Sequence, residues 1–404
     1  MQSVYRHRCL NEEQLAQYCY NELDTGENDY TLMRIRALVD TGFLEIHEYG
    51  DDQQCVFYLT HMGVQFIRDI SSEPLYMMDS KGVHRKYEAT AGMLKMTDNL
   101  LDHQTKLNAL SLEIVRRCNL DPACYKDSMF SANFTYAQPD GVLELPEFDI
   151  FLEMDMGHER TSALRAKWEH YRTYFNSRDY YLHRDKRIIV LFATERVSKL
   201  AVRRTSVVKS LNQTIFELFS PMFDCYIGTN EEMEEIAERL ITGKKGWFSR
   251  VGAYLQNKLG FAFSKPKQIV EACHEPYLYM RMLDGEGKPV VRDGRLQEFL
   301  FEDCSDRQML GLKRAACYKQ TQSLLSGKIG RDIPLLVLVS SEGEIYRDLS
   351  AVEARFVPNV YYVTAARLRN KPFYEALFQF DQLGNRYCFT DLSLKTQRYE
   401  KKQD

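Results

Sequence analysis

A mixed α/β fold is predicted for this chain of 404 residues, and three observations predict it. Two helical patterns and then two alternating stretches follow one another in residues 11–70. Residues 95–240 combine helical patterns with apolar stretches of strand type, and residues 269–404 repeat that order less clearly. A chain of this length is too long to fold around a single hydrophobic core. We therefore expect separate domains over residues 1–75, 95–240 and 269–404, with a basic, aromatic linker over residues 241–268.

The composition is that of a globular protein without a membrane segment. Hydrophobic residues make up 44% of the chain and charged residues 27%, which suits a folded core under a charged surface. No stretch approaches the about 18 apolar residues that span a bilayer, and the first residues lack the apolar centre of a signal peptide. We therefore expect a cytoplasmic protein that does not enter a membrane. With a net charge of −4, any contact with DNA must come from a local basic patch.

The first module has the element order of a winged helix-turn-helix. Residues 11–23 and 29–40 place apolar side chains three or four apart, which predicts two helices. Residues 43–49 and 54–60 then alternate as two strands around a turn, and residues 61–70 form a further helix. In this arrangement the second helix enters the major groove of DNA.

Three residues of that second helix, Tyr30, Thr31 and Arg34, lie off its apolar stripe and are the candidate DNA contacts. The charge of the module argues against this role. Twelve acidic side chains oppose five basic ones in residues 1–70, whereas a surface that binds phosphates needs the reverse. The alternative is a winged helix that dimerises or docks a partner. Residues 71–94 show no clear period and predict a linker or a short connecting helix.

Several acidic residues of the domain predicted over residues 95–240 are expected to lie close together. Asp140 follows Pro139 at a strand turn, and Glu153 and Asp155 are two apart on the next predicted strand, so their side chains share one face. Three carboxylates in this arrangement are suitable ligands for Mg²⁺ or Mn²⁺. Such a cation polarises a phosphodiester and generates hydroxide from bound water. Glu113, on the preceding helix, is a further candidate acid.

Pro139-Asp140, then Glu153 on a strand, then a helix with Tyr171 resembles the PD-(D/E)XK nuclease superfamily over about residues 100–200. The resemblance implies a restriction-endonuclease-like domain and a metal-dependent DNA endonuclease. The chain departs from the pattern because Asp155 stands where a catalytic lysine is expected.

A basic residue of the following helix, Lys167 or Arg165, is the candidate substitute for that lysine. The proposed catalytic set is therefore Asp140, Glu153, Asp155 and Lys167. In the alternative interpretation Asp155 caps the following helix or pairs with Arg160, and the site is inactive.

The C-terminal third carries a degenerate copy of this plan. Asp293-Gly294 corresponds to Asp140-Gly141, and an acidic strand, a helix and an apolar strand follow in both. Asp303 takes the place of Asp155, whereas Glu302 is shifted by one residue and would point to the opposite face. The second copy is thus predicted to be structural or to clamp DNA.

Residues 241–270 are strongly basic and contain no acidic side chain. Aromatic residues alternate with the basic ones, as in segments that track phosphates and stack bases. The candidate DNA contacts are Lys244, Lys245, Arg250 and Lys258. A membrane-surface or partner-binding helix fits nearly as well, and so does a linker whose aromatic side chains pack on the neighbouring domains.

A winged helix joined to Pro139-Asp140 and Glu153-Met154-Asp155-Met156-Gly157 also resembles the replication-relaxation family, over about residues 5–200. The resemblance implies a DNA-binding accessory protein in replication or conjugative mobilisation of a plasmid or integrative element. Its expected partners are duplex DNA of an origin region, a relaxase or other mobilisation protein, and a second copy of the chain. An active Mg²⁺- or Mn²⁺-dependent nuclease and an adaptor for a relaxase or coupling protein remain as alternatives.

Overall fold

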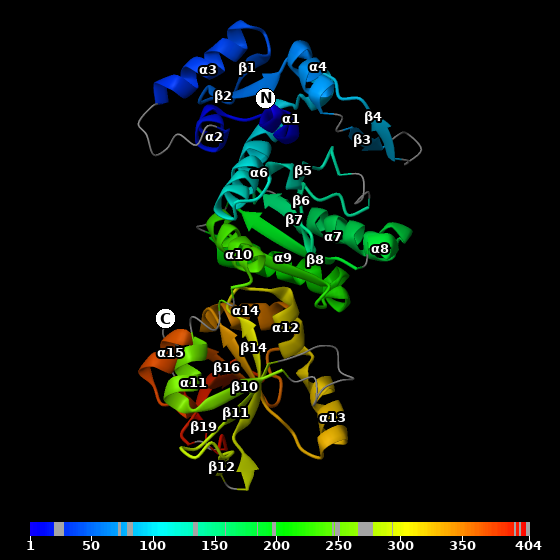
Figure 1. Cartoon of the computed structure of the whole chain (residues 1–404). Coiled ribbons are helices and arrows are strands. Elements are labelled where there is room, and N and C mark those ends of the chain that lie inside the picture. Colours follow the sequence, from blue (N-terminus) through cyan, green and yellow to red (C-terminus); the bar gives the residue numbers. More distant parts are fainter. Residues whose placement is uncertain are drawn as a thin grey trace. The chain divides into compact units, whose positions relative to one another are not determined.

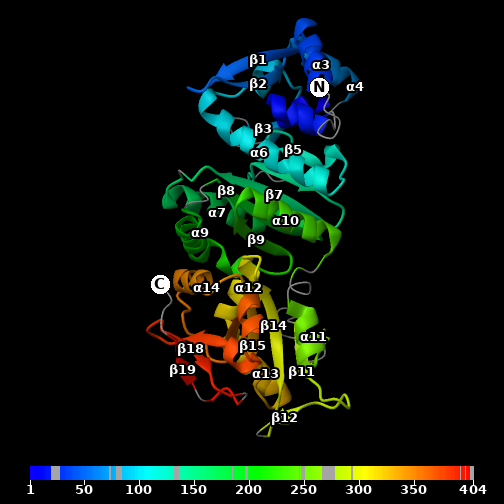
Figure 2. The same cartoon turned by 90° about the vertical axis from the view of Figure 1, so that its left-hand side faces the viewer.

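The computed structural model divides into two compact units, which are described separately (Figures 1 and 2). Unit 1 comprises residues 1–197 and 228–242, and unit 2 comprises residues 198–227 and 243–404. Helices and several sheets occur in both, so the predicted mixed α/β class is confirmed. The residues that the structure describes are 1–19, 28–71, 74–78, 84–131, 136–157, 159–183, 185–195, 199–244, 246, 251–265, 278–292, 294–391, 393–395 and 397–400.

The N-terminal module of unit 1 contains the expected succession of helices and strands. Its elements are α1 (Gln2–His7), α2 (Glu12–Gln14), η1 (Leu15–Cys19), α3 (Asn28–Asp40), β1 (Leu44–Tyr49), β2 (Gln54–Leu59) and α4 (His61–Ile70). Strands β1 and β2 pair antiparallel, with Leu44 opposite Leu59 and Tyr49 opposite Gln54. The predicted helices and hairpin are therefore present, and α1 is an additional helix that the sequence did not predict.

Local side-chain bonds fix where two of these helices begin. Asn11 accepts a hydrogen bond from the Gln14 amide, and the Gln14 side chain accepts one from the Asn11 amide, which forms a capping box for α2. Thr60 accepts a bond from the amide of Gly63 and so caps α4. The apolar faces then meet in one core that includes Ile35 of α3.

The segment over residues 71–94, predicted as a linker or a short connecting helix, contains a strand pair and a short helix where it is described. Strands β3 (Leu75–Met78) and β4 (His84–Tyr87) pair antiparallel, and α5 (Ala91–Leu94) follows. Leu75 is fully buried and Tyr87 packs against the core of the N-terminal module. Burial of these two apolar side chains explains why the segment is held in place although its sequence has no clear period.

The centre of unit 1 is formed by β5, β6, β7 and β8, which are neighbours in that order within a larger sheet. Its strands and the helices around them are α6 (Asp98–Arg117), η3 (Pro122–Cys124), β5 (Tyr125–Asp127), β6 (Gly141–Glu144), β7 (Phe148–Asp155), α7 (Thr161–Phe175), α8 (Arg178–His183), β8 (Arg187–Thr194) and α10 (Asn230–Thr242). Strands β5, β6 and β7 pair antiparallel, whereas β7 and β8 are parallel. Helix α7 makes the crossover that a parallel pair requires.

Helices cover both faces of this sheet, so β7 and β8 are buried along nearly their whole lengths (Figure 1). Such strands read as continuous apolar runs rather than alternating ones. Helix α7 buries Leu164, Trp168 and Tyr171, the face that its sequence predicted. Trp168 contacts Phe192 of β8, and Tyr171 contacts Phe151 of β7. The odd-numbered residues of β7 therefore point toward α7.

Unit 2 has its own core around a sheet in the order β10-β11-β14-β15-β16-β17-β18-β19. Strands β14, β15 and β16 are parallel to one another, and the remaining pairs are antiparallel. The elements of the unit are α9 (Leu200–Thr214), η5 (Phe216–Leu218), β9 (Phe223–Gly228), α11 (Ala253–Leu259), β10 (Phe261–Ser264), β11 (Leu278–Met282), β12 (Val291–Arg292), β13 (Arg295–Leu296), β14 (Glu298–Cys304), α12 (Met309–Ala316), α13 (Tyr318–Ile329), β15 (Leu335–Val339), α14 (Glu342–Ala351), β16 (Val360–Thr364), α15 (Ala365–Asn370), α16 (Phe373–Ala376), β17 (Phe378–Phe380), β18 (Arg386–Phe389) and β19 (Gln397–Tyr399).

Both units contain a helix, three antiparallel strands, a helical crossover and a parallel strand in the same succession. Unit 1 uses α6, β5, β6, β7, α7 and β8, and unit 2 uses α11, β10, β11, β14, α12 with α13, and β15. The residue pairs that end the two parallel ladders are Asp155 with Thr194 and Cys304 with Val339.

The register corrects one detail of the predicted repeat. Glu302 lies two residues before the end of the ladder in unit 2, as Glu153 does in unit 1. Glu302 is thus the counterpart of Glu153, and Asp303 is not the counterpart of Asp155. The sequence alignment was one residue out because it followed the order of the acids and not the pairing of the strands. Asp293 of the predicted repeat lies outside the described residues.

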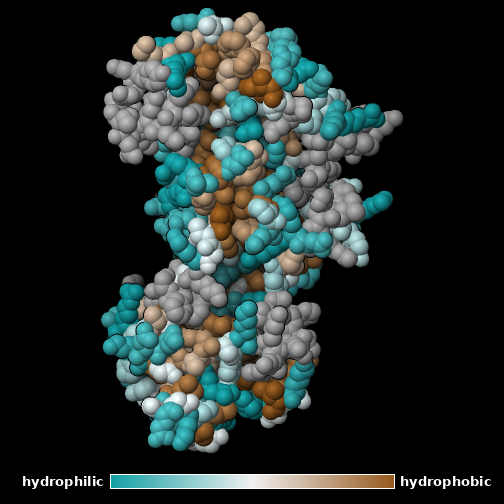
Figure 3. Space-filling view, in the orientation of Figure 1, coloured by the Kyte–Doolittle hydropathy of each residue, from teal (hydrophilic) through white to brown (hydrophobic). Residues whose placement is uncertain are grey.

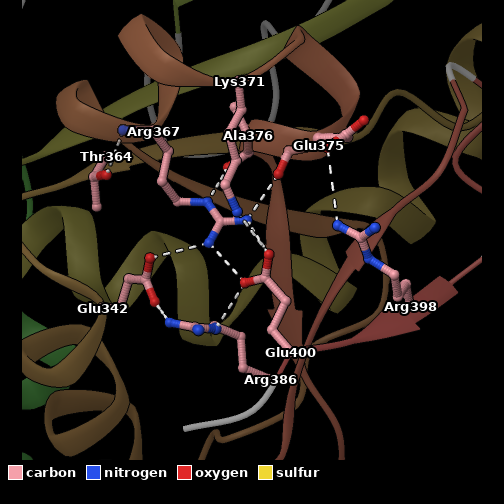
Figure 4. A network of polar contacts seen from close by, with 9 residues as sticks. All are labelled: Glu342, Thr364, Arg367, Lys371, Glu375, Ala376, Arg386, Arg398 and Glu400. Atoms are coloured by element: carbon pink, nitrogen blue, oxygen red, sulfur yellow. Dashed lines mark hydrogen bonds and ion pairs between the residues drawn. The ribbon is translucent and has the colours of Figure 1, made fainter. Parts of the chain in front are cut away.

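An ionic network holds the end of the described chain to unit 2 (Figure 4). The guanidinium of Arg367 on α15 donates to both carboxylate oxygens of Glu400, at 2.8 and 3.2 Å, and to Glu342 at 3.1 Å. Lys371 donates to Glu400 at 2.7 Å, and Arg386 of β18 pairs with both Glu400 and Glu342. Arg367 also donates to the carbonyl oxygens of residues 375 and 376, so all of its guanidinium N–H groups have an acceptor. The network thus joins α14, α15, α16 and β18 to residue 400.

Candidate functional site

A cluster of charged side chains lies at one end of the central sheet of unit 1. Asp140 directly precedes β6, Glu153 points from β7 toward α7, and Lys167 points back from α7. His103 of α6 and Tyr171 of α7 complete the cluster. The fold thus brings together residues from α6, β7 and α7 and from the turn before β6.

Gly141, the first residue of β6, explains part of this placement. A Cβ atom at this position would lie 2.9 Å from the ring of Tyr125, which is buried on the neighbouring strand. Glycine at this position leaves room for the ring of Tyr125 to pack over the start of β6. Pro139 and Asp140 are thereby held at the start of the strand, beside the buried middle of the sheet.

Lys167 connects the two carboxylates. Its Nζ atom lies 2.6 Å from Oε2 of Glu153 and 3.8 Å from Oδ2 of Asp140. The Tyr171 hydroxyl donates to Oε1 of Glu153 at 2.5 Å, so both oxygens of this carboxylate accept a bond. Glu159 is a third acid near the ammonium, at 3.8 Å. Lys167 was a predicted candidate for the missing lysine, and the structure brings it to Glu153; Arg165, the other candidate, points outward.

Asp140 is held from two directions. Its Oδ2 atom accepts a bond from the amide of Met154 at 2.8 Å and lies 3.3 Å from Nε2 of His103. Burial acts to raise the pKa of Asp140, but the charge of Lys167 and the bond from His103 outweigh it and lower the pKa to about 2. Burial acts to lower the pKa of His103, but its bond to Asp140 outweighs this and raises it. Asp140 is therefore an anion held between Lys167 and His103.

Glu153 is fully buried. Burial, supported by the charge of Asp140, raises the pKa of Glu153, although Lys167 acts in the opposite direction. Burial acts to lower the pKa of Lys167, but the surrounding carboxylates outweigh it and raise the pKa well above the usual range. Lys167 therefore keeps its proton, and burial makes Glu153 easier to protonate than an exposed glutamate.

Asp155, the third predicted carboxylate, has other partners. Its Oδ1 atom accepts a bond from the amide of Gly157 at 2.9 Å, and its Oδ2 atom accepts one from the Thr194 hydroxyl at 3.0 Å. It thus joins the ends of β7 and β8. Glu113, the further candidate acid, pairs with Arg116 and Arg117, each at 2.6 Å. Within the described part of the chain, no three His, Cys, Asp or Glu side chains are arranged to hold a metal ion.

The candidate DNA contacts of α3 differ in exposure. Thr31 is fully buried, in contrast to its expected outward position, because it lies four residues before Ile35 and continues the buried stripe of the helix. Arg34 is exposed, and the side chain of Tyr30 lies outside what the structure describes. Arg34 is therefore the described member of this set that faces solvent.

Exposed apolar side chains are a second feature of the N-terminal module. Met62, Phe66 and Ile70 follow one another every four residues along α4 and are 52%, 45% and 57% exposed. Met33 of α3 is also exposed. Brown and tan surface is visible over the part of Figure 3 that holds α3 and α4. This surface suits a protein partner better than it suits phosphate.

From residue 243 onward, the basic segment belongs to unit 2. Lys244 and Lys258 are exposed, as a phosphate contact requires, whereas Lys245 and Arg250 lie outside the described residues. The aromatic side chains of Phe261, Phe263 and Tyr254 pack in or against the core of unit 2. These three aromatics are therefore core residues, which favours the packing alternative over base stacking for them.

Comparison with known proteins adds one finding. A family model described as replication-relaxation matches residues 1–191. Residues 1–191 are thus similar to the replication-relaxation family. The predicted family is thus confirmed for this part of the chain, which includes the N-terminal module, the acid–lysine cluster and the first half of β8.

The match leaves residues 192–404 outside the replication-relaxation model. No curated protein and no solved structure was found to match the chain. Among the described residues, no helix combines the length and the apolarity needed to cross a bilayer.

Two members of the cluster could not be assigned from the sequence. His103 lies 37 positions before Asp140 on a helix whose period shows only that it has a buried face. Tyr171 was visible as a buried aromatic, but its hydroxyl bond to Glu153 depends on the distance between α7 and β7. A histidine or tyrosine on an amphipathic helix is no signal by itself.

Proposed function

We propose that this protein is a DNA-binding accessory factor in replication or mobilisation of a plasmid or integrative element. The replication-relaxation match over residues 1–191 carries this proposal. The order of α3, the β1–β2 hairpin and α4 supports a winged helix-turn-helix, with α3 as the helix that contacts DNA. Arg34 of α3 and Lys258 of α11 are the exposed basic residues assigned to phosphates.

The shared succession of strands and helices in the two units supports a restriction-endonuclease-like core that occurs twice. The acid–lysine cluster of unit 1 has two of the three predicted carboxylates, Asp140 and Glu153, and both are paired with cationic side chains. A degenerate nuclease core that binds DNA without cutting it accounts for both observations. We therefore place the accessory function ahead of catalysis.

Fluorescence anisotropy with labelled duplex and single-stranded DNA, repeated across a salt series, tests DNA binding. We expect affinity to fall linearly with the logarithm of salt concentration, because each phosphate contact releases counterions. Arg34→Ala and Lys258→Ala should each weaken binding and reduce the slope by about one unit. Lys288→Ala is the matched control, since Lys288 is an exposed lysine of unit 2 paired with Glu286.

Absence of binding at low salt would contradict the DNA-binding proposal. If the protein bound a relaxase or coupling protein under the same conditions, it would be identified as an adaptor. The exposed stripe of Met62, Phe66 and Ile70 on α4 is the surface we assign to such a partner. Phe66→Ser should weaken that complex and leave anisotropy with DNA unchanged.

One observation favours a second function, a metal-dependent nuclease: a lysine reaches the carboxylates from α7, at 2.6 Å from Glu153. The chemistry would require Mg²⁺ or Mn²⁺, and Asp140 and Glu153 would be its oxygen ligands. Incubation of supercoiled plasmid with either cation tests this function. Glu153→Gln should abolish any cutting, whereas Asp149→Asn, at the other end of the same strand, should not. Cutting that persists in Glu153→Gln would assign the activity to a contaminant.

A further inference from the structure

Lys167 stands where a divalent cation would have to bind if the cluster of unit 1 were a metal site. A metal bridging Asp140 and Glu153 would need the oxygens that face each other across the cluster, Oδ2 and Oε2. The ammonium of Lys167 already contacts both of these atoms. The oxygens of the third candidate ligand, Asp155, already accept bonds from the Gly157 amide and the Thr194 hydroxyl. Two cations cannot share this space without strong repulsion.

The second unit repeats the arrangement with a different cation. Glu302 occupies the same register position on β14 as Glu153 does on β7. Its two oxygens accept bonds from Arg314 of α12 at 2.8 and 3.0 Å. In both units, therefore, a buried glutamate of the third strand is neutralised by a basic residue of the helix that follows. A guanidinium in a two-bond pair with a carboxylate is a structural partner and cannot be a metal ligand.

From these two observations we propose that Lys167 is a built-in counter-ion that replaces the divalent cation in the Asp140–Glu153 cluster. The native cluster then binds neither Mg²⁺ nor Mn²⁺ at ordinary concentrations, and the carboxylates serve to hold α7 on the sheet. Removing the lysine exposes two buried carboxylates of like charge, and a divalent cation becomes the ion that best compensates them. This inference concerns the cluster only and deepens the proposed non-catalytic function.

Titration with Mn²⁺, followed by the electron paramagnetic resonance signal of the free ion, tests this proposal in the full-length chain. We expect no measurable binding of Mn²⁺ to the native cluster. Lys167→Met should bind Mn²⁺ at least about tenfold more tightly than the native protein does, because one nearby positive charge has been removed. Lys186→Met is the matched control: Lys186 pairs with Asp149 on the same strand at 3.0 Å, but at the opposite end. It should behave like the native protein.

The double variant Lys167→Met/Glu153→Gln locates the new site, since the gained Mn²⁺ binding should disappear. Two results would overturn the proposal. One is Mn²⁺ binding by the native protein that Glu153→Gln abolishes. The other is a folded Lys167→Met that gains no binding. If Lys167→Met is too unstable to titrate, Lys167→Gln, which keeps a polar head group, is used in its place. Because DNA is absent from this experiment, its outcome is independent of whether the chain binds DNA.

Discussion

At the scale of single residues, burial decides which ionisable groups matter. His7 of α1 is almost fully buried, its ring is stacked on Tyr125 with 4.4 Å between centroids, and its Nδ1 atom is bonded to the Ser3 carbonyl at 2.9 Å. Burial, only partly offset by that bond, lowers the pKa of His7 to about 4. The folded protein therefore keeps this imidazole neutral at a pH where the unfolded chain is protonated.

This difference predicts a loss of stability in mild acid. Because the unfolded histidine titrates near about 6.5, the stability that neutral His7 provides is complete above that pH and is lost as the pH falls toward about 4. We expect the change in the free energy of unfolding between about pH 7 and about pH 5 to contain a loss of about 2 kcal/mol in the native protein that is missing in His7→Gln. Urea unfolding of the native protein, His7→Gln and the exposed His61→Gln measures it. An equal drop in His7→Gln would refute the assignment.

At the scale of elements, close approaches and buried ion pairs fix how neighbours meet. Gly63 lies in the first turn of α4, and a Cβ atom there would collide with the carbonyl oxygen of Phe43, which precedes β1. Arg367 of α15 joins Glu342 and Glu400, which come from α14 and from the residue after β19 (Figure 4). Neither contact has a local sequence signal.

Gly63→Ala is expected to destabilise unit 1 by about 1–3 kcal/mol, because α4 must move away from Phe43 to make room for the methyl group. Gly92→Ala on α5 is the matched control, since nothing lies within 4 Å of its added Cβ atom. That change should be neutral or slightly stabilising. Chemical denaturation monitored by circular dichroism compares the two, and similar losses would show that the close approach is not what matters.

Arg367→Met should cost about 3–5 kcal/mol, because it leaves the carboxylates of Glu342 and Glu400 without their main buried partner. Arg398→Met removes an arginine that is 60% exposed and lies 3.9 Å from Glu375, and it should cost less than about 1 kcal/mol. The unfolding free energies of the two variants decide between a structural network and a set of surface pairs. Equal losses of unfolding free energy in the two variants would contradict a structural network.

At the scale of the whole molecule, the family match and the division into units nearly coincide. The replication-relaxation match ends at residue 191, and the first segment of unit 1 ends at residue 197. Unit 2 has a separate core, to which strands β14, β15 and β16 contribute apolar side chains on one face. Unit 2 therefore lies outside the part of the chain that the family defines, although it repeats the same order of strands and helices.

Because the two units have separate cores, we expect a core mutation in one unit to destabilise that unit and not the other. Leu338→Ala, in the core of unit 2, should cost about 2–5 kcal/mol, because it removes a buried side chain and leaves a cavity. Hydrogen exchange measured by mass spectrometry should show faster exchange in β14, β15 and β16 while β7 and β8 keep their protection. Faster exchange in all five strands would mean that the two units unfold together.

Much of the architecture was determined by the sequence alone, because local periods and turns are enough to set it. The helices and hairpin of residues 11–70, the buried face of α7 and the apolar strands β7 and β8 all follow from spacing that one element can satisfy by itself. The family followed from the short motif around Asp140 and Glu153. Lys167 could be proposed, together with Arg165, because it lies on the helix that follows the acidic strand.

Only the tertiary structure decided which partner each polar side chain finds. Thr31 is buried, Asp155 bonds to Thr194 and not to the cluster, and the aromatic residues near Lys258 pack inward. His103 meets Asp140, and Glu302 replaces Asp303 as the counterpart of Glu153. The physical reason is the same in each case. These outcomes depend on register and distance between elements, which a local pattern does not contain, and a shift of one residue on a strand turns a side chain to the other face.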